Sequence, residues 1–274
     1  MPLSATAWVR KMRGGSQAHM IVAEDGHSYV VKCKQNAQHR RILVNEWAAG
    51  ILLEHLGIPT AKPEIILLND EFLSANSELK VVTGSHEKPV LPGWHFGSRV
   101  PVDPSRFVLY DYLPDALLSQ VANLRDFLGA LVFDKWVHNA DSRQCVFFRA
   151  QIRHYSDAPA TRKTGFVAMM MDHGYIFGGP EWKLEDTPVS GLYPRHLVYR
   201  EVRGLDSFQP WLDLATNVPL SLLDTIGRSM PEWWLNGDRT ELDKLLEGLW
   251  RRRARLPHLL EDMRNVRGNP FPNW

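Results

Sequence analysis

The seven residues 138–144 read HNADSRQ, and they lie between the apolar run 128–137, which has the length of a helix, and the strand-like run 145–148. Removing an aspartate and an arginine from water without partners costs several kcal/mol each. A polar stretch between two apolar runs therefore needs a structural or a chemical reason. Asp141 is the residue whose role has to be explained.

The composition is that of an ordinary globular protein. The chain has 274 residues, 44% of them hydrophobic and 23% charged, which suits one large domain or two modest lobes. A net charge of +1 gives no support to binding of nucleic acid or of a membrane surface, and no apolar run has the length of a membrane span. Cys33 and Cys145 lie in apolar contexts typical of buried free thiols, and residues 1–15 lack the apolar core of a signal peptide. We therefore expect a cytoplasmic protein without nucleic-acid or membrane binding of its own.

The first part of the chain predicts a small antiparallel sheet that carries one helix. Alternating apolar residues predict strands at about 5–12, 19–23, 28–34, 61–68 and 107–112, with a turn at Gly14-Gly15-Ser16 and a helix at about 39–56. Residues 74–104 are polar and rich in glycine and proline, which predicts a long loop.

The character of the sequence changes after Pro114. We expect a long helix at about 115–138, strands at 145–148 and 166–171, and helices around 211–230 and 240–255. The predicted fold is α+β with two lobes. Residues 1–113 form an antiparallel-sheet N-lobe with a hinge at its end, and residues 114–274 form a mainly helical C-lobe.

Three features of the predicted N-lobe could bind a ligand. Gly14-Gly15-Ser16 lets the backbone approach a ligand closely, although two glycines between strands also make an ordinary turn. Lys32 lies on a strand among apolar neighbours. It could bind a ligand, or it could simply lie on the solvated face of that strand. Glu46 borders the apolar stripe of the helix, so it needs a cationic partner. Lys32, on the strand just before this helix, is the natural candidate, and a surface arginine such as Arg41 is the alternative.

Asp141 and Asp172 both lie where a regular element gives way to a loop. The segment MMMDHG (169–174) places Asp172 at the end of an apolar strand, and carboxylates in such positions commonly bind Mg²⁺. The alternative is that both aspartates cap backbone amides in turns. However, a glycine loop, a strand lysine, a helix glutamate, an aspartate loop and Asp-x-Gly, in this order, are the layout that phosphoryl transfer from ATP requires.

The chain resembles the HipA-like kinases, a bacterial branch of the protein-kinase-like fold. The resemblance covers roughly residues 10–180, and the C-terminal third matches only as a helical lobe. The segments that carry it are VVKCK (30–34), NEWAAGILLEHLGIP (45–59), PGWHFGSR (92–99), FDKWVHNADSRQ (133–144) and MMMDHGYIF (169–177).

The resemblance implies a kinase that uses ATP and Mg²⁺, and it implies a role for each matching residue. The glycine loop covers the phosphates, Lys32 binds them and is held by Glu46, Asp141 is the catalytic aspartate, and Asp172 is the main metal ligand. The adenine is received by a hinge. The implied loop and hinge residues are Gly14, Gly15, Ser16, Leu109, Tyr110, Asp111 and Tyr112.

One departure from the family pattern leaves two expectations, an active kinase and an inactive one. Relatives usually carry an asparagine about five residues after the catalytic aspartate, as a second metal ligand, and here that position is Val146. Gln144 is the nearest polar substitute: its amide oxygen could bind the metal or accept a hydrogen bond from the loop of Asp141. We expect phosphate transfer to a protein serine or threonine. The alternatives are a nucleotide-binding pseudokinase and a kinase of a small molecule or lipid head group. A small antitoxin-like partner is implied by the resemblance only.

Overall fold

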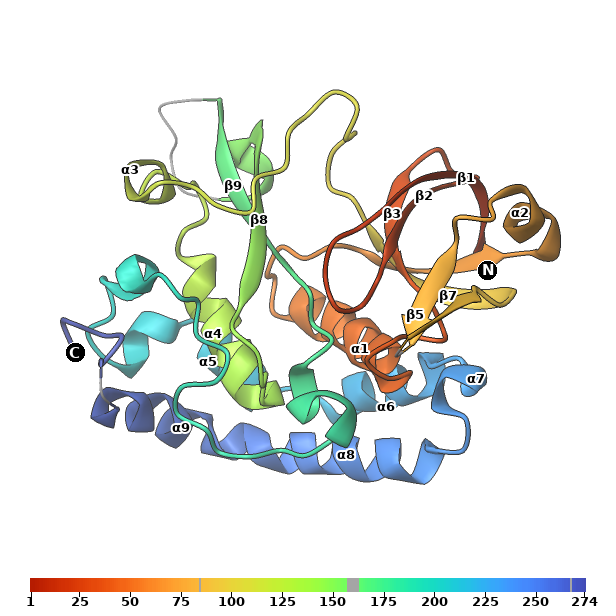
Figure 1. The fold of residues 1–274 in the computed structure, drawn as a ribbon. Coiled ribbons are helices and arrows are strands. Elements are labelled where there is room, and N and C mark those ends of the chain that lie inside the picture. Colours follow the sequence, from red (N-terminus) through yellow and green to blue (C-terminus); the bar gives the residue numbers. More distant parts are fainter. Residues whose placement is uncertain (84, 157–162, 267) are drawn as a thin grey trace.

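The computed structural model describes residues 1–83, 85–156, 163–266 and 268–274. Its first half contains a closed five-stranded barrel with the strand order β1-β2-β3-β7-β4 (Figure 1). The strands are β1 (Leu3–Lys11), β2 (His19–Ala23), β3 (Ser28–Lys32), β4 (Pro63–Leu68) and β7 (Gly93–Arg99). Neighbouring strands are antiparallel except β1 and β4, where Leu3 pairs with Ile66 in a parallel register. The expected antiparallel sheet is therefore corrected to a barrel that one parallel pair closes.

Strand β7 lies in a segment expected to form a loop, because its sequence GWHFGSR is rich in glycine and polar residues. It lies between β3 and β4 and pairs with both. Gly97 fits because a Cβ there would lie 2.6 Å from Cγ1 of Ile66. His95 is fully buried, its Nδ1 accepts a hydrogen bond from the Lys34 amide at 2.9 Å, and burial lowers its pKa to about 3. Gly97 and His95 therefore break the apolar alternation that predicts a strand, although both lie in β7, which pairs on both sides.

Two smaller elements lie between β4 and β7. Helix α2 (Asp70–Ala75) begins at Asn69, whose side chain accepts a hydrogen bond from the Phe72 amide. Strands β5 (Lys80–Thr83) and β6 (His86–Pro89) form a separate hairpin. The segment 74–104 therefore contains three strands, β5, β6 and β7, rather than one long loop.

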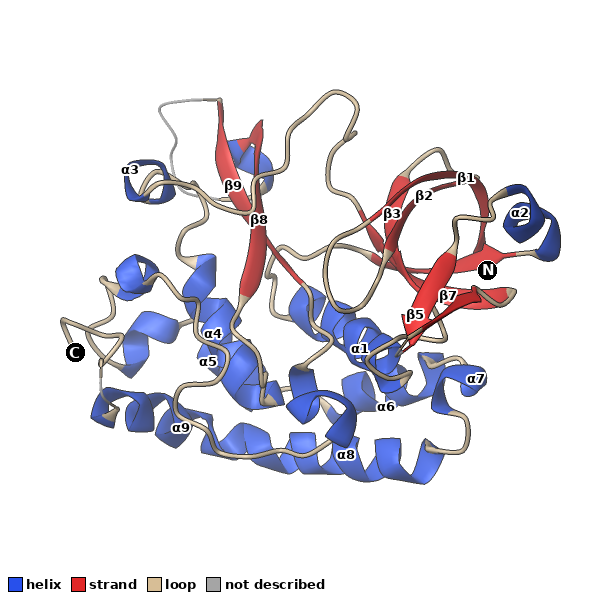
Figure 2. Cartoon of the chain, viewed as in Figure 1, coloured by secondary structure: helices blue, strands red, loops and turns tan. Residues whose placement is uncertain are grey.

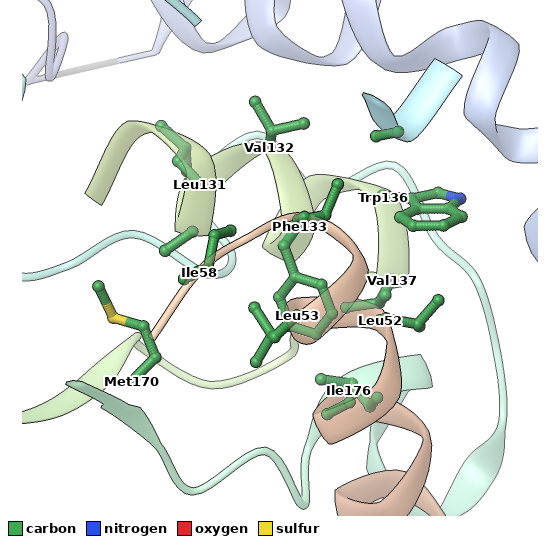
Figure 3. Close-up of a cluster of buried hydrophobic side chains, with 14 of the residues drawn as sticks. Leu52, Leu53, Ile58, Leu131, Val132, Phe133, Trp136, Val137, Met170 and Ile176 are labelled. Atoms are coloured by element: carbon green, nitrogen blue, oxygen red, sulfur yellow. The ribbon is translucent and has the colours of Figure 1, made fainter. Parts of the chain in front are cut away.

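Helix α1 (Arg41–His55) connects the barrel to the second half of the chain. Its apolar face and the turn that follows it pack against helix α4 (Asp126–Val137) in one buried cluster (Figure 3). The side chains labelled in that figure are Leu52, Leu53, Ile58, Leu131, Val132, Phe133, Trp136, Val137, Met170 and Ile176. This shared core fixes α1, which carries Glu46, relative to the strand that leads to Asp172.

The second half is mainly helical, with one hairpin formed by β8 (Gln144–Gln151) and β9 (Thr164–Met171) above the helices (Figure 2). The other helices are α3 (Asp115–Leu118), α5 (Trp211–Thr216), α6 (Leu220–Ser229), α7 (Glu232–Leu235), α8 (Arg239–Arg252) and α9 (Leu256–Asp262). Short 3₁₀ turns are η1 (Ile152–His154), η2 (Ile176–Glu181), η3 (His196–Tyr199), η4 (Leu205–Phe208), η5 (Arg253–Arg255) and η6 (Met263–Asn265). Within the described residues, no helix combines the length and the apolar character needed to cross a membrane.

The expected long helix at 115–138 is broken into α3 and α4. The residues between the two helices pair with the open edge of β9. The Ala122 amide donates to the Phe166 carbonyl at 2.9 Å, and the Asn123 side chain accepts from the Ala168 amide at 2.8 Å and donates to its carbonyl. Because backbone groups at a strand edge need hydrogen-bond partners, this pairing outweighs continuation of the helix.

The expected strand at 107–112 is also wrong. Only Tyr110 pairs, through two backbone hydrogen bonds of 2.9 and 2.8 Å with Phe147 of β8. Phe107, Val108 and Tyr112 are 50%, 61% and 62% exposed. The barrel is closed and offers this segment no edge, so it remains a linker whose backbone pairs with β8 at one residue.

Candidate active site

Lys32, Glu46 and Asp172 meet at the junction of the two halves. The Lys32 ammonium at the end of β3 donates to Oε1 of Glu46 on α1 and, at 2.8 Å, to Oδ1 of Asp172 after β9. The side chains of Lys32 and Glu46 are 7% and 2% exposed, whereas that of Asp172 is 38% exposed. Arg41, the alternative partner of Glu46, instead pairs with Asp238 at 2.8 Å. The sequence prediction that Glu46 pairs with Lys32 rather than Arg41 matches the structure.

This cluster has one ammonium group for two carboxylates. Burial lowers the pKa of Lys32, but Glu46 and Asp172 outweigh burial and leave it above its ordinary value. Burial and Asp172 raise the pKa of Glu46 above its usual value in spite of Lys32. Burial also raises the pKa of Asp172, and Lys32 more than compensates, so that pKa stays below its usual value. The cluster thus has an excess of negative charge at the carboxylate that solvent reaches.

The backbone around Asp172 is docked on α1. Asp172 has φ of 55°, a left-handed conformation that costs a residue with a side chain about 1–2 kcal/mol. The amide of His173 donates to Oε1 of Glu46 at 3.0 Å, which holds the next residue in place. A Cβ at Gly174 would lie 2.7 Å from Cγ2 of Ile42, so only glycine permits this approach to α1.

A second charged cluster lies behind the first and is closed to solvent. Nε of Arg143 donates to Oδ2 of Asp134 at 2.8 Å, and the two side chains are 1% and 0% exposed. Arg143 also donates to Nδ1 of His173 at 2.9 Å and to the Met171 carbonyl at 3.3 Å. His173 Nε2 lies 3.0 Å from the Thr60 hydroxyl, and burial, with Arg143 nearby, lowers the His173 pKa well below its usual value. A neutral His173 therefore links α4, the loop 138–144 and the Asp172 segment.

Asp141 is exposed, which corrects the idea that the apolar flanks would bury it. Its Oδ1 accepts from the Ser142 amide at 2.7 Å and its Oδ2 from Nε2 of Gln144 at 3.2 Å. The Asp141 amide donates to Oδ1 of Asn139 at 3.2 Å. The desolvation argument applies to Arg143, not to Asp141. The Asp141 carboxylate is oriented by its own loop and remains accessible.

Strand register distinguishes Gln144 from Val146 as a neighbour of Asp172. Gln144 pairs with Met171, the residue before Asp172, whereas Val146 pairs with Met169. Val146 is 7% exposed and belongs to a small apolar cluster with Met169. Gln144 is therefore the polar residue of β8 whose register position is next to Asp172.

The glycine loop joins β1 to β2, and Gln38 links it to the segment that follows Asp172. Gly14 has φ of 119°, which only glycine adopts readily. A Cβ at Gly15 would lie 2.9 Å from Nε2 of Gln38, and that same amide donates to the Tyr175 hydroxyl at 3.3 Å. Ser16 is half-buried. Sequence reasoning missed Gln38, because nothing in its local pattern indicates a contact with residues so far along the chain.

The four expected hinge residues lie in different environments. Leu109 packs beside Val102 and Met169. The amide and carbonyl of Tyr110 are engaged with Phe147. Asp111 and Tyr112 are exposed, and the Arg195 guanidinium lies over the Tyr112 ring at 4.6 Å. Only Leu109 belongs to the apolar cluster of the β8–β9 hairpin.

A cavity of about 590 Å³ opens between the barrel, the linker residues 100–104 and β9. Its lining includes the apolar side chains of Ala61, Val102 and Met169. Thr60 also lines it and contacts His173, so the cavity adjoins the Asp172 segment. Across the described parts of the chain, no three His, Cys, Asp or Glu side chains gather into a metal site of their own.

Comparisons with known proteins agree with this geometry. A family model described as HipA-like kinase matches residues 7–146, about half of the chain and the part that contains Lys32, Glu46 and Asp141. No curated protein matches the chain.

Solved structures show that the fold is shared more widely. A structure of the Golgi casein kinase is 14% identical with a TM-score of 0.53, over 97% of this chain and 72% of that chain. The same kinase with Mn/ADP bound is 14% identical with a TM-score of 0.54, over 97% and 74%. The structure of hydra Fam20 with sugar is 14% identical with a TM-score of 0.56, over 96% and 86%. At this identity the likeness establishes only that the chain shares the mixed α and β fold of these kinases. The family model goes further: the chain belongs to the HipA-like kinase family and is a kinase.

Proposed function

We propose that the protein transfers the γ-phosphoryl group of ATP to a hydroxyl group, with the nucleotide between an N-lobe of residues 1–113 and a C-lobe of residues 114–274. The observation that carries the proposal is the Lys32 ammonium shared between Glu46 and Asp172. It joins the barrel, α1 and the end of β9 at one point. In phosphoryl transfer such a lysine neutralises the nucleotide phosphates and such an aspartate holds the metal.

The cavity beside the linker supports a site for adenosine. Small-molecule sites typically have volumes of roughly 300–1,000 Å³, and this cavity has about 590 Å³, with Val102 and Met169 lining it beside charged side chains such as Arg99. The linker residues 100–104 provide its outer wall, with Leu109 packed beside them. Because the amide and carbonyl of Tyr110 are engaged, we assign the adenine wall to residues 100–104 rather than to 109–112. The nucleotide of the Mn/ADP-bound Golgi casein kinase also supports this ligand class.

The donor groups near Asp172 fit a hard divalent cation such as Mg²⁺. The Asp172 carboxylate is accessible, and the Gln144 side chain begins beside it. Mg²⁺ commonly binds through one or two carboxylates together with substrate phosphates and water, so a larger protein cage is not needed. When bound, the metal would neutralise charge on the transferred phosphoryl group. The excess negative charge of the cluster favours such a cation.

Asp141 acts on the acceptor in this proposal. The acceptor oxygen attacks the γ-phosphorus, its proton passes to the Asp141 carboxylate, and the bond to the β-phosphate oxygen breaks so that ADP leaves with that electron pair. The Ser142 amide and the Gln144 side chain orient Asp141 through their hydrogen bonds to its two carboxylate oxygens. Lys32 stays on the α- and β-phosphates, and the loop of Gly14, Gly15 and Ser16 covers them.

We assign the acceptor to the serine or threonine hydroxyl of a protein. The support is that two of the solved structures with this fold are described as a casein kinase. A cytoplasmic location in a bacterium and a small antitoxin-like partner are further parts of the proposal that rest on the family alone.

A nucleotide-binding pseudokinase is the second candidate. Val146 motivates it, because a buried valine stands where relatives carry a metal-binding asparagine. A protein that binds Mg-ATP without turnover would support this candidate.

Calorimetric titration of ATP, with and without Mg²⁺, tests the nucleotide site. We expect Lys32→Met to weaken Mg-ATP binding at least about tenfold, which corresponds to loss of one charge-assisted contact. Lys88→Met is the matched control, because Lys88 is an exposed lysine of the β5–β6 hairpin, and it should bind as the wild type does. Equal affinity in the wild type and in Lys32→Met would overturn the assignment.

A further inference from the structure

Residues 183–192, which we call the strap, follow the Asp172 segment and run beside the loop that carries Asp141. The Gly191 amide donates to the Asp141 carbonyl at 3.1 Å, and the Arg143 amide donates to the Leu192 carbonyl at 3.1 Å. These hydrogen bonds attach the strap to the loop on both sides of Ser142. The strap has no helix or strand of its own, so its shape depends on side chains from other elements.

Lys135 on α4 provides the most concentrated of these contacts. It is 3% exposed, and its ammonium donates to the carbonyls of Thr187, Pro188 and Ser190 at 2.9, 2.8 and 2.6 Å. An ammonium group has three N–H donors, so all of them are used on the strap. The carboxylate of the adjacent Asp134 is already taken by Arg143. The strap is thus folded around a buried cation that carbonyl dipoles solvate.

The inner end of the strap fits tightly over the same turn of α4. Gly191 has φ of 74°, and a Cβ there would lie 2.4 Å from Cβ of Asp134. Only glycine allows both the backbone conformation and the contact. Lys135 therefore fixes the strap at the residues just before its two hydrogen bonds to the Asp141 loop.

The outer end of the strap is held by α8, by the turn that follows it and by His138, whose Nδ1 lies 2.7 Å from the Lys183 carbonyl and 3.1 Å from the Glu185 amide. Arg252 donates to Oδ1 of Asp186 at 2.6 Å and to the Glu185 carbonyl at 2.7 Å, and Arg255 pairs with Asp186 at 2.5 Å. These contacts explain part of the arginine-rich end of α8. Arg252 and Arg255 bind Glu185 and Asp186, whereas Lys135 binds carbonyls within residues 187–190.

We propose that Lys135 is a positioning residue, whose ammonium group organises the strap so that the strap holds the Asp141 loop in the geometry for phosphoryl transfer. This proposal rests on the function proposed above. The physical reason is that three carbonyl groups converging without a cation repel one another and lose the N–H donors of the ammonium, although the Thr187 carbonyl still accepts from the Ser190 hydroxyl at 3.0 Å. Without the ammonium the strap must open, and the Asp141 carbonyl loses the Gly191 amide.

Lys135→Met tests the proposal in the full-length chain, because methionine keeps most of the length and removes the charge. We expect kcat to fall about 10- to 100-fold, as a displacement of about 1 Å in a catalytic group produces. The KM for ATP should stay within about twofold, because the nucleotide contacts are elsewhere. Hydrogen exchange of peptides from residues 183–192 should become faster. Lys183→Met is the matched control, since this lysine lies on the strap with a side chain 72% exposed and should leave all three readouts unchanged.

Chemical rescue provides a readout that a general loss of stability would not give. Adding ethylammonium to Lys135→Ala returns N–H donors to the three carbonyls, so we expect kcat to recover at least about fivefold, a gain of about 1 kcal/mol. Tetramethylammonium has the same charge without N–H donors and should not restore activity. Gly191→Ala displaces the strap from its other side and should lower kcat with little change in the KM for ATP.

The outcomes separate this proposal from the function on which it rests. No phosphate transfer by the wild type would remove the proposed function. An active wild type with an equally active Lys135→Met overturns the role of Lys135 alone. That role is also overturned if Lys135→Met loses kcat and ATP affinity together, or if rescue by the two ammonium ions is equal. If Lys135→Met does not fold, Gly191→Ala decides, and wild-type kcat in that variant overturns the proposal.

Discussion

Two charged clusters meet at the Asp172–His173 peptide, and they differ in balance and in access to solvent. The front cluster has one ammonium, Lys32, for the two carboxylates of Glu46 and Asp172, and Asp172 is 38% exposed. The rear cluster pairs one guanidinium, Arg143, with one carboxylate at side-chain exposures of 1% and 0%. The front cluster is short of positive charge and accessible, whereas the rear cluster is balanced and closed.

This difference indicates a division of labour. A closed, fully paired cluster fixes the distances between elements and gains nothing from a ligand, whereas an open cluster with excess negative charge gains from a bound cation. Substitutions should therefore change the free energy of unfolding most in the rear cluster and least at Asp172. The following predictions are ordered by that change.

Arg143→Met should have the largest effect. It leaves Asp134 buried without its cation and also removes the contacts to His173 and Met171, so we expect a loss of about 4–5 kcal/mol in the free energy of unfolding. Urea denaturation followed by fluorescence measures it. Arg251→Met is the matched control, because its pair with Glu247 is exposed and should contribute less than about 1 kcal/mol. Equal losses in the two variants would mean that the rear cluster does not hold the fold.

Lys32→Met should cost less, about 3 kcal/mol at pH 8, because Glu46 can take up a proton. Burial already raises the pKa of Glu46, and loss of Lys32 raises it further. A carboxyl group whose pKa is higher in the folded than in the unfolded state stabilises the fold at low pH and loses this contribution as the pH rises through the folded-state value. The difference from the wild type should therefore shrink between pH 8 and pH 5. A constant difference over this range would contradict a buried Glu46 that depends on Lys32.

His173→Phe should have a moderate effect. It keeps the ring but removes the acceptor for Arg143 and the contact with Thr60, which should cost about 1–2 kcal/mol of stability. Because His173 also fixes the backbone beside Asp172, the Mg²⁺ concentration for half-maximal activity should rise. His173→Gln retains a polar side chain and should lose less of both. Identical Mg²⁺ dependence in the wild type and His173→Phe would show that the rear cluster does not influence metal binding at Asp172.

Asp172→Asn should change stability least, by less than about 1 kcal/mol in either direction. It removes one of two carboxylates that share a single ammonium, and asparagine can still accept a hydrogen bond from Lys32. The same variant should lose the Mg²⁺ dependence of ATP binding. A variant that is strongly destabilised, with its Mg²⁺ dependence intact, would reverse the roles assigned to the two clusters.

The Lys32–Glu46 pair of the front cluster could be predicted from the sequence, whereas the contact of Lys32 with Asp172 and the whole rear cluster could not. Glu46 borders an apolar helix stripe and Lys32 lies on the preceding strand, so their pairing follows from local pattern. Asp134 lies inside an apolar helix, and only the fold shows that it meets Arg143 and that His173 joins them. Lys135 and Gln38 were missed for the same reason, because their partners are far along the chain.

The elements of the fold were predictable where side-chain alternation is plain and not where packing replaces it. Strands β2 and β3 and helix α1 lie close to the predicted ranges. Strand β7 was missed because Gly97 and His95 break the apolar pattern for reasons of packing. The strand predicted at 107–112 has the right composition, but the barrel is closed to it and only Tyr110 pairs with the edge of β8. Pairing and closure depend on the whole sheet, and local sequence does not encode them.

The most direct test of the central claim is phosphate transfer from γ-labelled ATP with Mg²⁺ or Mn²⁺, by the wild type, Asp141→Ala and the exposed control Asp243→Asn. Product is followed on the protein itself, on added proteins and as free phosphate. We predict transfer by the wild type and the control, and a loss of at least about 100-fold in Asp141→Ala, the contribution typical of a positioned proton acceptor. Equal transfer by the wild type and Asp141→Ala would contradict the assignment of Asp141. Absence of transfer by the wild type, with ATP bound, would favour the pseudokinase.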